Sequence, residues 1–286
     1  MVLSGGIMKI NVFSSGSAGN CTLVSSGEEN ILIDVGITKK QIDENLSQHS
    51  LTLNDINAVL ITHEHVDHIR AFNSIIKYDN IKIYITKGTL DFIFESNRNK
   101  PNIYNLMQER LKEGKIVILN RVKDNIFYES FSLINLKIDV IPTFHDARES
   151  IGFVINEGLK KLVFITDTGY VHQALYENIS NAECYILESN HDPQLVMASS
   201  RPYSLKMRIL SEHGHMSNED SMVTLAHVMG DKTKYVMHAH VSQECNLDYI
   251  IEKTREKVFY DYALDTSNIE FVILKPYPND EVEIWK

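Results

Sequence analysis

A chain of 286 residues can bury a substantial hydrophobic core, and its 43% hydrophobic and 23% charged residues are ordinary for a globular protein. No apolar run approaches the roughly 18 residues of a membrane span, and the opening MVLSGGIMKI lacks the basic segment and apolar core of a secretory signal. A net charge of −10 argues against a surface that coats nucleic acid generally, although it leaves room for a local basic groove.

The cysteines and the continuity of the chain predict its compartment and organisation. Cys21, Cys184 and Cys245 are scattered, odd in number and without metal-type spacing, so we interpret them as reduced thiols of a cytoplasmic protein. No repeat, linker or low-complexity tract interrupts the sequence. We therefore expect a single domain over residues 8–286, preceded by a disordered N-terminal extension at residues 1–7.

The first part of the chain reads as short strands. KINVFSSG and NCTLVSS predict two strands joined by the Ser/Gly turn SSGSAGN, and ENILIDVG predicts a third. Helical composition follows at residues 38–50, and the apolar run INAVLIT predicts another strand.

A helix is expected to start near His68, because four apolar side chains fall on one helical face, namely Ile69, Phe72, Ile75 and Ile76. IKIYIT then predicts a strand, and LDFIFES begins a mostly helical stretch that runs towards Gly114.

Four later apolar runs, LKIDVIPTF, KLVFIT, CYILES and KYVMHAHV, each end in or continue into residues that can bind metal. These residues are His145, Asp167, the segment ESNHD and His240. The tail adds a helix at LDYIIEKTREKVF and strands at NIEFVILK and EVEIW. Strands interleaved with helices, without a nucleotide-binding glycine loop, predict a layered α/β (α+β) domain. Loops at strand ends can converge on one edge of a sheet, so these segments are expected to meet.

The stretch THEHVDHI at residues 62–69 crowds metal-binding groups into one turn. His63 and His65 are two apart at a strand end and can face the same side, while Asp67 and His68 point in different directions. Four ligands so close together suit two neighbouring ions better than one. Imidazoles with a carboxylate suit Zn²⁺, with Mn²⁺ or Fe as alternatives, and the cation outweighs the carboxylate charge. Glu64 points the opposite way and is expected behind the ligands or at the surface.

A histidine-rich exposed turn without metal is the alternative interpretation, and for an isolated HxH pair it would be preferred. The complete HxHxDH spacing between a strand and a helix, with further ligand residues at other strand ends, favours a metal site.

These motifs resemble the metallo-β-lactamase superfamily: HxHxDH at residues 63–68, with TFHDA, ITDTGY and HVSQECN downstream. SSGSAGNCTLV, ITDTGYV, ESNHD, ILSEHGHMSNEDS and HVSQECN together resemble its YycJ/WalJ-like branch, which is associated with DNA exonuclease activity. The similarity runs from about Met8 to beyond Cys245. HxHxDH alone indicates only the superfamily, whereas ESNHD with GHMSNED is much more specific to the branch.

The resemblance implies an αββα sandwich with two divalent metal ions. The first ion would be held by His63, His65 and His145. The second would be held by Asp67, His68 and His240, with Asp167 bridging. A hydroxide shared between ions about 3.5–4 Å apart would be the nucleophile, because metal binding lowers the pKa of water to about 7. Asp67 would also orient this nucleophile or accept its proton.

The last ligand has an alternative, since His238 lies two residues before His240 and both could face the site. The match to the HVS motif of the family favours His240, with His238 packed or supporting the ligands.

The substrate is predicted from residues 199–220. A basic cluster in an acidic chain, Arg201, Lys206 and Arg208, leads directly into His215, and phosphate offers charge for such a cluster to bind. By resemblance, His215 contacts the scissile phosphate or protonates the leaving group. The alternative is that the cluster is an ordinary solvated helix face.

Further substrate contacts are expected from two loops. In ESNHD, Glu188 is expected to support the site while Asn190 and His191 reach the substrate, with a structural role for both as the alternative. In SSGSAGN, Ser17 and Asn20 are expected to hydrogen-bond a phosphate.

Together these features predict a metal-dependent phosphodiesterase that hydrolyses DNA, a 5′-to-3′ exonuclease by resemblance alone. The interval from Asp167 to His240 is too short for the inserted domain of the superfamily's RNA-processing exonucleases, which disfavours RNA. One alternative is a small-molecule hydrolase that cleaves a lactone, thioester or cyclic phosphodiester. Another is a regulatory or DNA-binding protein that keeps metal for stability. No membrane association is expected, and the sequence does not identify protein partners.

Overall fold

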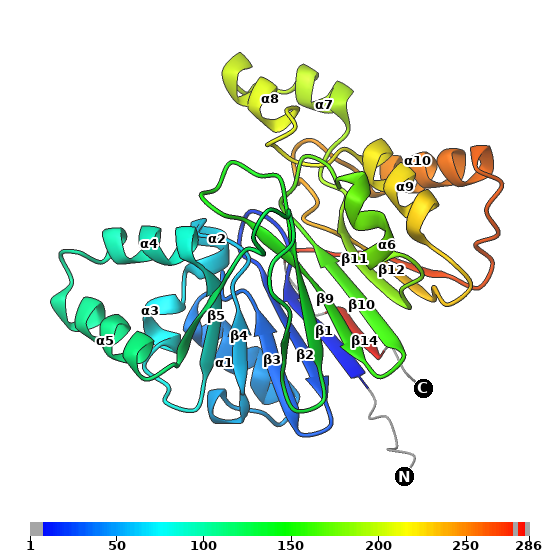
Figure 1. The fold of residues 1–286 in the computed structure, drawn as a ribbon. Coiled ribbons are helices and arrows are strands. Elements are labelled where there is room, and N and C mark those ends of the chain that lie inside the picture. The colour runs from blue at the N-terminus through cyan, green and yellow to red at the C-terminus, as the bar shows by residue number, and fades with distance from the viewer. Residues whose placement is uncertain (1–7, 277–279, 284–286) are drawn as a thin grey trace, which may run out of the picture. The chain divides into compact units, whose positions relative to one another are not determined.

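The computed structural model describes residues 8–276 and 280–283 (Figure 1). The chain divides into two compact units. Unit 1 comprises the residues up to Lys137, the segment Ala147–Ile151 and the residues from Pro276 onwards. Unit 2 comprises Ile138–Asp146 and Gly152–Lys275. The N-terminal extension expected at residues 1–7 lies outside the described residues.

The sheet of unit 1 has the strand order β14-β1-β2-β3-β4-β5-β6. Pairing is antiparallel from β14 to β3 and parallel from β3 to β6. The parallel part follows from the helices that connect its strands. The strands of this unit are β1 (Met8–Ser14), β2 (Cys21–Ser26), β3 (Glu29–Ile33), β4 (Ala58–Leu60), β5 (Lys82–Thr86), β6 (Ile116–Leu119), the two-residue β7 (Phe131–Ser132) and β14 (Asp280–Glu283).

The helices of unit 1 pack against its strands (Figure 1), and the two together bury one hydrophobic core. They are α1 (Lys39–Gln48), η1 (Leu53–Asp55), α2 (Val66–Ile69), α3 (Phe72–Ile75), α4 (Lys87–Ser96) and α5 (Pro101–Lys112). Helix α1 begins where Thr38 and Gln41 form a reciprocal capping box. The core joins Val59 of β4 to Ile42, Phe72 and Leu90 of the helices, and each such side chain stabilises the fold by about 1.5–3 kcal/mol.

The helix predicted near His68 begins at Val66 and is broken into α2 and α3. The break has a clear cause, because the backbone N–H of Ala71 donates to the carbonyl of Val35, 2.9 Å away, instead of continuing the helix.

In unit 2 the second sheet follows the order β13-β12-β11-β10-β9-β8, and its remaining strand is the two-residue β7. The pairs from β10 to β13 are parallel, and β9 pairs antiparallel with β10. Parallel strands leave their carboxyl ends at one edge, which is where the predicted metal-binding residues occur. The strands are β8 (Lys137–Pro142), β9 (Ile151–Glu157), β10 (Lys160–Ile165), β11 (Cys184–Glu188), β12 (Tyr235–Ala239) and β13 (Glu270–Ile273).

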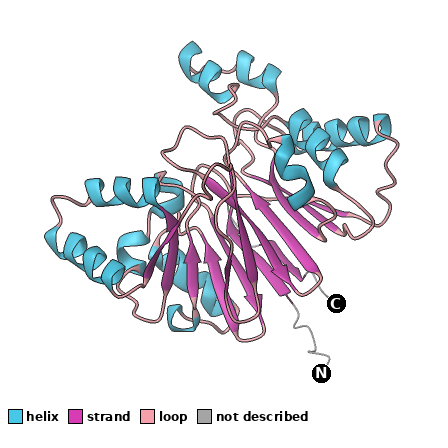
Figure 2. Ribbon diagram, viewed as in Figure 1, coloured by secondary structure: helices cyan, strands magenta, loops and turns pink. Residues whose placement is uncertain are grey.

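Helices α9 and α10 pack beside this sheet, and α7 and α8 form a separate pair in the same unit (Figure 2). The helices are η2 (Gln173–Leu175), α6 (Tyr176–Ile179), α7 (Pro193–Ala198), α8 (Tyr203–Ile209), α9 (Asn218–Val228) and α10 (Asp248–Asp261). Helix α10 meets the sheet where the rings of Phe259 and Phe271 lie 5.9 Å apart. A small separate core of Val196, Ile209 and Cys245 supports α7 and α8.

The mixed α/β prediction is confirmed, with two sheets flanked by helices. Among the described residues, the helices are too short or too polar to cross a bilayer.

Candidate metal centre

The HxHxDH turn follows β4 directly and is held in unit 1. His65 is the N-cap residue of α2, and its backbone is extended (φ −62°, ψ 147°). This turn brings three imidazoles together: ring centroids are 4.6 Å apart for His63 and His65, and 4.0 Å apart for His63 and His68. His63 and His68 are buried, whereas His65 and Asp67 are partly exposed. The turn therefore presents nitrogen and oxygen ligands within a few ångströms of one another.

A buried carboxylate sets the tautomer of His68. Asp34, directly after β3, accepts hydrogen bonds from the Thr62 N–H (2.9 Å) and the Thr62 hydroxyl (2.8 Å), and its Oδ2 lies 2.7 Å from His68 Nδ1. Burial raises the pKa of Asp34, while the charge and hydrogen bond of His68 oppose this rise. With Nδ1–H donating to Asp34, the Nε2 of His68 carries the lone pair that a metal needs.

The loop at residues 15–20 closes over the same turn. The N–H of Asn20 donates to the carbonyl of Asp67 (2.7 Å), and its Nδ2 lies 2.9 Å from His68 Nε2. The carboxamide oxygen of Asn20 accepts from the N–H of Gly16 (2.8 Å). These bonds hold the loop against the HxHxDH turn, and Ser17 at its tip is exposed.

Gly36 is required at the back of this turn. A Cβ added there would lie 1.6 Å from the carbonyl oxygen of Asp67, which no side chain tolerates. The glycine thus lets two backbones approach closely.

Glu64 faces away from the histidines and is buried. Its carboxylate accepts from the N–H of Arg148 (2.6 Å) and the hydroxyl of Thr89 (3.1 Å). Of the two expected positions, behind the ligands or at the surface, the structure shows the buried one. Glu64 therefore anchors α4 and the segment at residue 148 to the turn.

A second cluster gathers at the strand ends of unit 2. Oδ1 of Asp167 lies 3.8 Å from Nε2 of His145, 3.5 Å from Nε2 of His240 and 3.8 Å from Nδ1 of His215. Ligand atoms of Asp167, Glu188, His215 and His240 all lie within 4.8 Å of one another. The sequence predicted this convergence from the ends of the apolar runs.

Glu188 at the end of β11 organises the cluster. Its Oε1 lies 2.7 Å from His215 Nδ1 and 3.2 Å from His240 Nδ1, and its Oε2 accepts from the N–H of Thr168 (2.8 Å). Burial alone would raise the pKa of Glu188, but the charge and hydrogen bond of His215, with the bond from His240, keep this pKa below its ordinary value. Both Nδ1 atoms face one ionised oxygen, and donation from the Nδ1–H of His240 would leave its Nε2 with the lone pair that a metal needs.

His145 is oriented in the same manner by backbone. Its Nδ1 lies 2.8 Å from the carbonyl oxygen of Gly214, which leaves the Nε2 lone pair directed at Asp167. Burial lowers the pKa of His145, so its ring stays neutral, as a metal ligand must be.

Three residues of the clusters adopt left-handed backbone, which is uncommon outside glycine. Asp34 (φ 60°) follows β3, Asp167 (φ 53°) follows β10 and His240 (φ 51°) follows β12. Such conformations cost about 1–3 kcal/mol each and concentrate at functional sites.

The donor set fits a divalent cation. Two ligands bound at about 2.0–2.2 Å in tetrahedral geometry lie roughly 3.4 Å apart, close to the 3.5–3.8 Å between Asp167 Oδ1 and the Nε2 atoms of His145 and His240. Neutral, oriented imidazoles and a carboxylate are also the chemistry that Zn²⁺ and related ions prefer.

His238 and His240 face different surroundings. His238 is fully buried in β12, and its ring stacks on Phe271 with centroids 6.2 Å apart. Burial lowers the pKa of His238 to about 3, with the charge of Arg255 acting in the same direction. His240 lies beyond the strand end and joins Asp167 and Glu188.

The expected substrate residues at positions 190–208 are engaged in contacts within unit 2. The basic cluster is paired: Arg201 with Glu244 (3.0 Å), Arg208 with Asp146, and the Lys206 ammonium with the carbonyl of Met197 (2.7 Å).

Asn190 donates to the carbonyl of His240 (2.7 Å) and is buried. His191 is also buried, which lowers its pKa to about 4. His215 remains partly exposed, with 20% of its side chain accessible.

Asp34 and Thr62 are the supporting residues that sequence reasoning missed. Asp34 ends the buried run ILID, and an acidic residue at the end of an apolar strand is the signal that could have identified it.

Comparison with known proteins places this chain in a family. The model of the β-lactamase superfamily domain matches residues 29–239. The chain belongs to the metallo-β-lactamase superfamily. It is a hydrolase of this superfamily, as the HxHxDH motif and its resemblance predicted.

Curated relatives of the chain support the branch. The exodeoxyribonuclease YycJ of Bacillus anthracis is 30% identical over 244 residues, 84% of each chain. The exodeoxyribonuclease WalJ of Streptococcus pneumoniae is 29% identical over 246 residues, 86% of each chain. These matches confirm the resemblance to YycJ/WalJ proteins.

Solved structures support the fold. The metallo-β-lactamase fold protein YhfI of Bacillus subtilis aligns with a TM-score of 0.65 at 16% identity, over 96% of this chain and all of that one. Human tRNase Z, short form, aligns with a TM-score of 0.63 at 17% identity, over 96% and 98%. At these identities the likeness concerns the fold alone.

Proposed function

We propose that this enzyme is a metal-dependent phosphodiesterase that hydrolyses DNA as a 5′-to-3′ exonuclease. The observation that carries the proposal is the oriented donor set. Four proposed ligand residues lie in one turn of unit 1 and three more lie at strand ends of unit 2. Acceptors beside the Nδ1 atoms of His68, His145 and His240 support metal binding through Nε2. Relatives that are named exodeoxyribonucleases, at about 30% identity over most of the chain, point to DNA as the substrate.

The family arrangement gives the residues that would hold two divalent ions. The first would take His63, His65 and His145, and the second would take Asp67, His68 and His240, with Asp167 between them. Such a pair of ions supplies Lewis acidity and a water that is ionised at neutral pH. Zn²⁺ and Mn²⁺ are the expected metals, with Fe as an alternative.

The chain's own residues would position the attacking water and the scissile phosphate and would transfer protons. Asp67 is placed at the turn to orient the attacking water or to accept its proton. His215 receives its orientation from Glu188, 2.7 Å from its Nδ1, and its partly exposed ring would contact the scissile phosphate or, as the imidazolium, protonate the leaving oxygen. The proposed contacts to the DNA strand away from the cleaved bond are Ser17, Asn20, Asn190, His191 and the basic cluster.

A digestion assay tests the function. Purified protein would be offered duplex DNA, single-stranded DNA and RNA, labelled at either end, with Mn²⁺ or Zn²⁺. We expect metal-dependent loss of DNA from the 5′ end, at least 100-fold slower for Asp67→Ala, since removing one catalytic group typically costs about 10²–10⁴-fold. Asp43→Ala, a surface carboxylate paired with Lys39, is the matched control and should digest normally.

Two results would defeat the proposal. One is DNA digestion that persists without metal or in Asp67→Ala. The other is turnover of a lactone, thioester or cyclic phosphodiester without action on DNA, which would make the enzyme a small-molecule hydrolase.

A further inference from the structure

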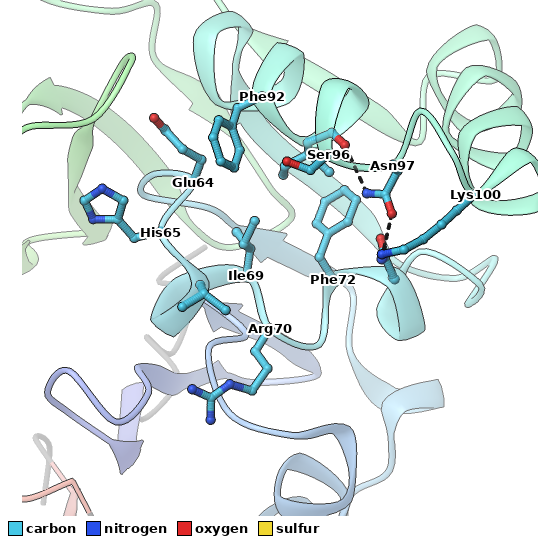
Figure 3. Close-up of a pocket in the computed structure, with 12 residues that line it drawn as sticks. Glu64, His65, Ile69, Arg70, Phe72, Phe92, Ser96, Asn97 and Lys100 are labelled. Carbon is cyan, nitrogen blue, oxygen red and sulfur yellow. Dashed lines mark hydrogen bonds between the residues drawn. The ribbon is translucent and has the colours of Figure 1, made fainter.

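A pocket of about 320 Å³ lies in unit 1 beside the HxHxDH turn (Figure 3). One wall comes from α2 and α3, and the facing wall comes from α4. Its apolar side chains include Ile69, Phe72 and Phe92. Glu64 and His65 line one end and point apart, and Lys100 lies at the other end. The pocket thus opens next to a residue that is proposed to bind metal.

The size of the pocket suits one ring system. Its volume is at the lower end of the roughly 300–1,000 Å³ range of small-molecule sites. Two phenylalanines of its walls supply aromatic faces, Phe72 as a buried floor and Phe92 partly exposed. The guanidinium carbon of Arg148 lies 5.2 Å from the Phe92 ring centroid, and Glu95 pairs with that guanidinium at 2.6 Å. Phe92 is therefore held in place before any ligand arrives.

Polar groups occupy the far part of the pocket. Nδ2 of Asn73 donates to Oδ1 of Asn97 (2.9 Å), and Nδ2 of Asn97 donates to the carbonyl of Ile93 (3.0 Å). Oδ1 of Asn73 is buried and has no hydrogen-bond partner among the described residues. Lys100 is exposed and adds positive charge at the rim.

We propose that this pocket receives a nucleobase of the DNA strand being cut, adjacent to the phosphodiester at the HxHxDH turn. This inference rests on the proposed function and names how the same site grips its substrate. A nucleobase offers a face for Phe92 and a neighbouring phosphate for Lys100. An apolar side chain of a partner protein would satisfy only the first of these groups.

The test compares intact DNA with DNA that lacks bases. Wild type, Phe92→Ala and Phe92→Leu would digest oligonucleotides carrying a single abasic residue at successive positions near the cleaved end. On intact DNA we expect kcat/KM to fall about 5- to 150-fold in both variants, the range of one base–aromatic stack. When the abasic residue stands where the pocket would take a base, the kcat/KM of wild type should fall by a similar factor. The kcat/KM of the two variants should fall no further on that substrate.

Two controls separate a specific loss from damage to the fold. Phe94→Ala removes a ring from the same helix, where it packs on Tyr104 with centroids 5.2 Å apart and does not line this pocket, and it should retain the abasic response of wild type. An oligonucleotide made only of abasic residues should be cut equally by wild type and Phe92→Leu.

The outcomes are distinct. The nucleobase pocket would be overturned if Phe92→Leu cut the fully abasic strand as much more slowly than wild type as it cuts intact DNA. It would also be overturned if no single abasic position removed the difference in kcat/KM between wild type and the variants. Either result would leave the nuclease function intact. Undiminished cleavage by both variants would also overturn it and would favour an apolar side chain of another protein as occupant. A wild-type protein that digests no DNA would instead defeat the proposed function.

Discussion

Replacing Asp34 by asparagine changes the tautomer of His68 with little change in shape. Asparagine adopts left-handed backbone readily, so the φ of 60° at this position is retained. If the asparagine oxygen keeps the Thr62 N–H, its NH₂ group faces His68 Nδ1, where the carboxylate oxygen now lies 2.7 Å away. His68 must then accept at Nδ1 and carry its proton on Nε2, the atom that a metal needs.

The expected magnitude follows from supporting residues of other metal sites, where loss of the partner of a histidine costs about 10–100-fold in metal affinity. The proton on His68 Nε2 would then face the Nδ2 group of Asn20, 2.9 Å away. Two buried donors that face each other destabilise the fold by about 1–3 kcal/mol. We therefore expect Asp34→Asn to fold, to melt several degrees lower, and to bind Zn²⁺ at least tenfold more weakly.

A competitive titration against a coloured zinc chelator would measure this affinity, with melting in EDTA as the measure of fold stability. Asp43→Asn, a surface substitution on α1, is the control. A folded Asp34→Asn protein whose zinc affinity stays within twofold of wild type would refute the tautomer argument.

The other predictions concern the supports of the two clusters. Gly36→Ala should lower the melting temperature and zinc content, because its Cβ would meet the Asp67 carbonyl; Gly114→Asn, in open space, is the control, and equal melting curves would contradict this. Glu188→Gln should lower kcat about 10–100-fold, because it removes the shared acceptor of two rings; unchanged kcat would exclude the positioning role. His238→Leu should keep full zinc content and melt no lower than wild type, since both ring nitrogens lack hydrogen bonds among the described residues. Elemental analysis that shows metal loss in His238→Leu would make it a ligand.

Removing metal should also destabilise the protein. A ligand at 100 times its dissociation constant stabilises the native state by about 2.7 kcal/mol, so EDTA should lower the melting temperature by several degrees. Melting curves that coincide with and without EDTA and added Zn²⁺ would argue against a resident ion.

The sequence predicted the strands that carry ligands, the helices of unit 1 and α10, because those segments have strong apolar patterns. It did not predict α6, α7 or α9. It missed β9, whose apolar run IGFVIN carries no ligand, and it joined α2 to α3, because the carbonyl of Val35 that interrupts them is more than thirty residues away in the chain. A local sequence pattern reflects interactions between residues that are close in sequence, so it does not predict a hydrogen bond to such a distant acceptor.

The candidate site shows the same division. HxHxDH was recognised because its spacing is itself the signal, whereas Asp34 acts through a single contact to His68 that no spacing records. The partners of the basic cluster, Glu244 and Asp146, were likewise invisible to local reasoning. His238 and His240 could not be separated by strand alternation, because His240 lies past the last paired residue of β12.

The left-handed residues at the ends of β3, β10 and β12 limit how this site could be altered or transplanted. Exchanging Asp167 or His240 for a β-branched residue would fail on backbone grounds before any question of metal preference arose, whereas asparagine or glycine would keep the chain path and lose only the ligand. A designer who grafts these ligands onto another sheet must therefore first find strands that already turn in this way, and choose the coordinating side chains second.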